Sequence, residues 1–122
     1  MAACKLSEKA GTLHITIEQG ATFNPVLTWK DELGALIDLS GFSARMQMRE
    51  TVESEVVVHE ATTVNNQILL GGIAGTITFD IPAATTAGFS FDTVVYDLEL
   101  QSPLGVVTRL LKGDIYLSKE VT

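Results

Sequence analysis

Thr12-Leu13-His14-Ile15-Thr16-Ile17-Glu18 alternates polar and apolar side chains along its whole length. In an extended chain successive side chains point to opposite faces, so Leu13, Ile15 and Ile17 share one face. This two-residue period is typical of a strand that buries one face and leaves the other in water. The stretch therefore predicts a half-buried β-strand near the start of the chain.

The same period returns along the rest of the chain, between turns that contain glycine. Antiparallel sheets with one face on a core and one in water produce this pattern. We therefore predict an all-β fold, an antiparallel two-sheet β-sandwich of the immunoglobulin-like kind with about eight strands, and a small barrel is the alternative. The alternating segments are residues 23–29, 44–49, 76–81, 94–101 and 106–117.

Prolines and glycines indicate where these strands are interrupted. Pro25 lacks an N–H group and predicts an edge strand or a bulge. Residues 82–88 begin with proline and end with glycine, which predicts one short helical turn. Residues 102–105 predict the turn of a hairpin, and Gly113 predicts a bulge or kink in its return strand. Two further short strands are expected, over residues 35–39 and 56–59.

The length and charge of the chain limit what it can be. Its 122 residues suit one domain, which we place at residues 12–122, preceded by an N-terminal arm at residues 1–11. The net charge of -7 disfavours phosphate backbones and anionic lipid, so we expect no nucleic-acid and no membrane partner. The single cysteine, Cys4, cannot form an intrachain disulfide, and no segment resembles an export signal.

No residue pattern predicts catalysis or metal binding. The two histidines, His14 and His59, lack further ligands at the spacing of a zinc site. No serine lies in a Gly-x-Ser-x-Gly elbow. Asp97 and Glu99 are two residues apart on one strand, which predicts a polar face rather than the acid pair of a glycosidase. We therefore predict no enzyme, no catalytic residue, no cofactor and no metal site.

The large aromatic residues offer a second kind of candidate site. Trp29, Tyr96 and Tyr116 would form a carbohydrate-stacking platform if they were exposed. Trp29 continues the apolar face of Leu27, and Tyr96 continues that of Leu98, so we predict core packing. A carbohydrate-binding module is kept as an alternative function.

Arginines provide the remaining candidates. Arg45 and Arg49 point outward from a predicted strand of an acidic protein, and Arg109 interrupts an apolar strand. Arginine forms strong paired hydrogen bonds with carboxylates, either within one sheet or across a subunit interface. Both readings are open at this point.

Several turn and strand segments together resemble those of a known group of proteins. In that group an early strand ends in an aromatic residue, a D-x-x-G turn follows, and a D-L-[ST]-G segment leads into a strand that ends in arginine. The matching segments of this chain are Gly20-Ala21-Thr22-Phe23, Trp29-Lys30-Asp31-Glu32-Leu33-Gly34, Asp38-Leu39-Ser40-Gly41-Phe42, Met46-Gln47-Met48-Arg49, Tyr96-Asp97-Leu98-Glu99-Leu100 and Pro103-Leu104-Gly105. In these segments the chain resembles small β-sandwich domains of tailed-bacteriophage virion proteins and is similar to the N-terminal domain of phage baseplate upper proteins.

The resemblance implies a non-enzymatic structural protein of a phage virion, made in the host cytoplasm and placed at the tail or baseplate. Its expected partners are other virion structural proteins, and a homo-oligomer or ring is expected. A capsid decoration protein is the alternative within this class. The residues that we expect at protein interfaces are Cys4, Lys5, Arg45, Arg49, Glu53 and Glu55.

Overall fold

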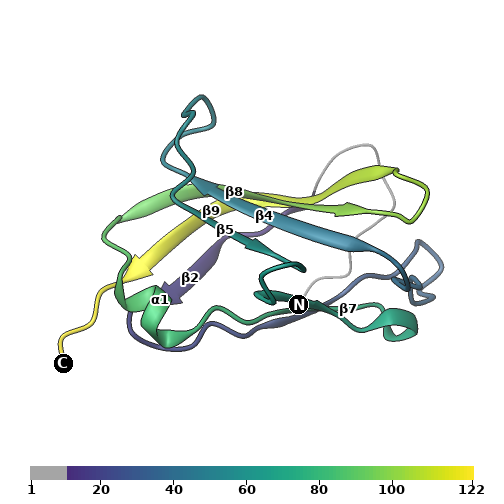
Figure 1. Cartoon of the computed structure of the whole chain (residues 1–122), viewed down its shortest axis with the longest axis horizontal. Helices are drawn as coiled ribbons and strands as arrows, with labels where there is room; N and C mark the ends of the chain where they lie inside the picture. Colours follow the sequence, from purple (N-terminus) through teal and green to yellow (C-terminus); the bar gives the residue numbers. More distant parts are fainter. Residues whose placement is uncertain (1–10) are drawn as a thin grey trace.

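A computed structural model of the chain describes residues 11–122, which form two β-sheets packed face to face (Figure 1). The all-β two-sheet sandwich predicted from the alternation is confirmed. Within these residues there are nine strands, one short α-helix and one 3-10 turn. They are β1 (Gly11–Thr12), β2 (Ile15–Glu18), β3 (Val26–Thr28), β4 (Ser43–Arg49), β5 (His59–Thr62), β6 (Ile68–Leu70), η1 (Gly72–Ala74), β7 (Thr76–Phe79), α1 (Ala83–Ala87), β8 (Thr93–Gln101) and β9 (Val107–Ser118).

The larger sheet has the strand order β1-β9-β8-β4-β5, with β2 also paired to β9, and the smaller has the order β3-β7-β6. Most neighbouring strands are antiparallel, as predicted. The exceptions are β1 and β2, which run parallel to β9. A parallel neighbour cannot be joined by a tight hairpin, and β2 and β9 are indeed the first and last long elements of the domain. The predicted antiparallel sandwich thus holds for every pair of strands except the two that join β1 and β2 to β9.

The core lies between the two sheets and is filled by alternate residues of each strand. Met46 of β4 and Leu98 of β8 are fully buried, and they meet Ile77 of β7 in one hydrophobic cluster. The residues between them on β4 and β8 point away from the core. Burying apolar surface stabilises the fold by about 25 cal/mol per Å². The alternation of apolar residues therefore determines which face of each strand turns toward the core.

The irregularity in β9 lies three residues before the position that its glycine suggested. Leu98 pairs with Leu111 but Glu99 pairs with Arg109, so Leu110 is the extra residue of a β-bulge. Leu110 and Leu111 are consequently both buried. Gly113 has another role, because an added Cβ there would lie 2.8 Å from the carbonyl carbon of Leu13. It allows the N-terminal strands to approach β9 closely.

Two of the short strands predicted from composition are not formed. In residues 35–39 the structure has only an isolated bridge between Lys30 and Leu36, and the segment then leaves the sheet as the Leu39 N–H donates to the Gly72 carbonyl. In residues 56–59 only His59 belongs to a strand. Pairing with β4 begins at His59, opposite Met48, so the valines before it stay in the connecting loop.

The predicted helical turn at residues 82–88 is confirmed as α1, which follows Pro82 and ends before Gly88. Thr86 of α1 is completely buried and is the one buried polar side chain found within residues 11–122. Its hydroxyl accepts a hydrogen bond from the Gly20 N–H at 3.0 Å and donates to the Ala21 carbonyl at 2.8 Å. The helix thereby holds the turn that joins the two sheets.

Candidate functional site

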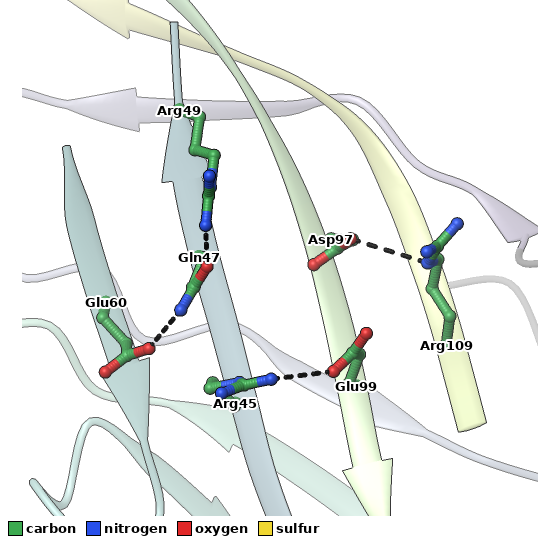
Figure 2. Close-up of polar contacts among 7 residues, drawn as sticks. All are labelled: Arg45, Gln47, Arg49, Glu60, Asp97, Glu99 and Arg109. Carbon is green, nitrogen blue, oxygen red and sulfur yellow. Dashed lines mark hydrogen bonds and ion pairs between the residues drawn. The ribbon is translucent and has the colours of Figure 1, made fainter. Parts of the chain in front are cut away.

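All three arginines of the chain lie on the solvent face of the larger sheet (Figure 2). Arg45 and Arg49 come from β4, and Arg109 comes from β9 on the far side of β8. They point outward because they alternate with buried residues of the same strands. We call this surface the arginine face; it consists of Arg45, Gln47, Arg49, Glu60, Asp97, Glu99 and Arg109.

Positive and negative side chains alternate across this face. An Arg45 Nη2 lies 3.2 Å from Glu99 Oε1, and Arg109 Nε lies 3.5 Å from Asp97 Oδ2. The two arginine side chains are 57% and 58% exposed. Exposed ion pairs of this kind contribute roughly 0–1 kcal/mol to folding and weaken with salt. These two ion pairs therefore contribute little to the stability of the fold.

Arg49 connects the arginine face to the loop that follows β4. One Nη of Arg49 donates to the Ser54 carbonyl at 2.6 Å, and the other donates to Gln47 Oε1 at 2.9 Å. Gln47 in turn donates to Glu60 Oε2 at 2.6 Å. A single row of hydrogen bonds thus runs from the loop across β4 to β5. The loop, residues 50–58, projects from the body of the domain in Figure 1.

A shallow hollow of about 280 Å³ lies on the arginine face. Burial raises the pKa of the Asp97 carboxyl above its usual value, and the neighbouring Glu99 charge raises it further, while Arg109 and Arg45 oppose the shift. Removing water from this carboxylate is therefore costly unless a cation stays close to it. The hollow is lined by Arg45, Gln47, Arg49, Val52, Val95, Tyr96, Asp97, Glu99 and Arg109.

The structure brings together four of the six interface residues predicted from sequence. Arg45 and Arg49 are on the arginine face, and Glu53 and Glu55 are exposed on the loop that Arg49 holds. Cys4 and Lys5 lie outside the described residues.

The structure shows which partners of the arginines lie within one chain. Within one chain they pair with carboxylates and amides of their own sheet. The sequence analysis did not single out Gln47 or Glu60, because their role depends on which strands become neighbours. In the sequence, only the alternation of polar and apolar residues in β4 indicated that Gln47 points outward.

The two histidines are held in separate surroundings. His14 Nδ1 lies 3.6 Å from Asp114 Oδ2. His59 Nε2 lies 2.6 Å from Gln67 Oε1, and its ring packs edge-on against Phe89. Over residues 11–122 there is no group of three or more potential metal ligands. The described part of the chain also contains no helix long and apolar enough to cross a membrane.

The aromatic residues do not form a shared platform. Trp29 and Tyr96 are each only 4% exposed, which confirms the predicted core packing of both. Tyr116 is 45% exposed, so core packing was the wrong expectation there. It lies between the buried Ile115 and Leu117, and alternation places it on the opposite face. The only tryptophan of the chain is thus unavailable for stacking against a sugar.

Comparisons with known proteins add little to this geometry. No protein-family model and no curated protein matches the chain. Among solved structures, the chain is similar to extracellular domains 3–5 of Drosophila OTK, with 14% sequence identity and a TM-score of 0.35. That match covers 96% of this chain but spans only 35% of the other.

Proposed function

We propose that the chain is a non-enzymatic structural protein of a tailed-bacteriophage virion, a tail or baseplate connector subunit that acts through protein–protein contacts. The observation that supports contact formation most directly is the arginine face. Arg45 and Arg109 are more than half exposed, and each lies within ion-pair distance of a carboxylate of the same sheet. The phage assignment itself comes from the resemblance of the turn and strand segments.

The arginine face suits binding because its charges are self-complementary. When two such faces meet about a twofold axis, an arginine of one copy can approach a carboxylate of the other, in addition to its own partner. Burial at an interface strengthens hydrogen bonds between arginine and carboxylate relative to water. Arg45 with Glu99 and Arg109 with Asp97 are placed for such an exchange. A symmetric multimer or ring is the assembly that we propose.

Changing Arg45 and Arg49 together to alanine is expected to weaken self-association at least tenfold. Without Arg45, the Glu99 carboxylates would lose water at the interface without gaining an arginine partner. Removing one member of a buried charge pair costs about 2 kcal/mol or more. Sedimentation equilibrium at low and high salt measures the change in the dissociation constant.

A charge-matched control is Lys30→Ala with Lys119→Ala, which removes two cations away from the arginine face. Lys119 pairs with Asp92 at 2.8 Å beyond the end of the sheet. We expect this control to associate like the parent chain, and both double variants to unfold within about 1 kcal/mol of the parent. Equal association of the parent and the Arg45→Ala/Arg49→Ala chain would remove the arginine face from the proposal.

Immunogold electron microscopy of purified particles from the source of the sequence tests the virion assignment. We expect antibody against the chain to label the tail end. Label spread over the head would replace the connector by a capsid decoration protein. Intact and partly disrupted particles that both stay unlabelled would contradict a place in the virion.

A further inference from the structure

Strand β3 forms one edge of the smaller sheet, and its hydrogen bonds to β7 show which backbone groups point outward. Phe23 exchanges two hydrogen bonds with Ile81, the Pro25 carbonyl accepts one from Phe79, and the Trp29 N–H donates to Gly75. In an antiparallel pair, every second residue points its N–H and C=O toward the neighbouring strand. The residues between them, Asn24, Val26 and Thr28, therefore direct these groups away from β7.

This outer edge is open in the described part of the chain. Within residues 11–122 no hydrogen bond reaches the outward groups of Asn24, Val26 and Thr28, and the Val26 side chain is 54% exposed. Pro25 does not close the edge, because its missing N–H would have pointed to β7. A row of free donors and acceptors at a sheet edge is a template for another strand.

The β5 edge of the larger sheet has partners for most of its outward backbone groups. On β5, Asn65 Oδ1 accepts from the Thr62 N–H at 2.9 Å, and Asn65 Nδ2 donates to the Glu60 carbonyl at 3.0 Å. The Gln67 N–H also binds the Thr62 carbonyl at 3.2 Å. One asparagine side chain thus takes the place of a neighbouring strand. The β3 edge therefore differs from the β5 edge, where a side chain occupies the outward backbone groups.

Apolar side chains lie next to the open edge. Phe23, just before β3, is only partly buried and packs against Phe79. On β2, an edge strand of the other sheet, Ile15 is also only partly buried. A strand added to β3 would cover both with the side chains of its inward face.

We propose that β3 receives an extended strand from a second copy of this chain, supplied by residues 1–10. An extended stretch of this length reaches roughly 33 Å, more than the open edge requires. In an extended strand Ala2, Cys4 and Leu6 would share one face, which suits an inward side as far as residue 6; Glu8 would follow on the same face. Lys5 and Lys9 outnumber its one acid, whereas the chain as a whole carries -7. The segment is therefore attracted to the body of the domain.

The direction in which the chain enters the domain favours a second copy, rather than the same chain, as the source of the added strand. In Figure 1 the chain runs leftward through β2 and returns rightward along the opposite sheet through β3. Gly11 pairs with Leu111, so the described chain begins beside the middle of β9 on the edge of the larger sheet. A strand that continued backward from Gly11 in line with β1 would follow the edge of the larger sheet and would not lie on the β3 edge of its own chain. This inference names a partner for the assembly proposed above and rests on it for its biological role.

Disulfide trapping between two full-length chains tests the exchange. Both chains carry Cys4→Ser; one also carries Val26→Cys and the other Ser7→Cys. Position 26 on β3 and position 7 in the added strand would both face the solvent side of the extended sheet. After mixing and mild oxidation, we expect a heterodimer whose disulfide joins positions 7 and 26, identified by mass spectrometry. Each chain then carries a single cysteine, so any disulfide that forms must be intermolecular.

The matched control replaces Val26→Cys by Val107→Cys, which lies on β9 and is 55% exposed. We expect at least tenfold less heterodimer from this mixture. Equal yields for the two positions would contradict the exchange. One chain with both Ser7→Cys and Val26→Cys that forms only an internal disulfide would also contradict it. Trapping that fails while the Arg45→Ala/Arg49→Ala change still weakens association would overturn this inference alone and leave the proposed function standing.

Discussion

Gly113→Ala is expected to lower the free energy of unfolding by about 3 kcal/mol, the upper part of the range for overpacked positions. The added Cβ would overlap the carbonyl oxygen of Leu13 and lie 2.8 Å from its carbonyl carbon. Both are backbone atoms, which cannot move aside by changing a rotamer. The N-terminal strands must therefore separate from β9. Fully buried Ile17 would lose packing as they do.

Urea unfolding followed by tryptophan fluorescence measures this loss. Gly88→Ala is the matched control, since a Cβ at position 88 would meet its nearest atom, the Thr85 carbonyl oxygen, at 3.5 Å. At a position with ordinary backbone angles, replacing glycine by alanine typically stabilises by about 0.4–1 kcal/mol. A similar loss in both variants would show that the close approach of Leu13 is not the cause. If Gly113→Ala also reduces trapping between copies, the position of β1 and β2 matters for where residues 1–10 leave the domain.

The faces of β4 and β8 could be predicted because they depend on local information. Met46 and Met48 alternate with arginines, and Leu98 alternates with acids, so burial of the apolar side chains fixes the outward direction of the charges. The exposed Arg45 is a direct consequence. This local rule failed where β9 carries an extra residue, because a bulge restarts the alternation after Leu110.

The partners on the arginine face could not be predicted from the same alternation. Arg45 and Glu99 are 54 positions apart, and their contact depends on β4 lying beside β8 in one register. A shift by one residue would turn every side chain of the strand to the other face. The parallel pairing of β2 with β9 is similarly non-local, since it joins residues 15–18 to residues 115–118. The periodicity of either strand is the same for a parallel and an antiparallel neighbour.

Thr86→Val is expected to lower the free energy of unfolding by about 2 kcal/mol, the cost of leaving buried polar groups without partners. Valine keeps the shape of threonine but cannot accept from the Gly20 N–H or donate to the Ala21 carbonyl. These groups belong to the turn between β2 and β3, so the loss falls on the connection between the two sheets. Thermal or urea unfolding detects it.

Thr86→Ser is the matched control, because it keeps the hydroxyl and removes only a methyl group. We expect it to lose about 1 kcal/mol, as for one buried methylene-sized group. A loss from Thr86→Ser as large as that from Thr86→Val would assign the stability to packing rather than to hydrogen bonds. The turn also sets where β3 begins, so Thr86→Val should reduce trapping at position 26 under conditions where the chain remains folded. Unchanged trapping would mean that strand addition at β3 does not depend on the hydrogen bonds between Thr86 of α1 and the turn.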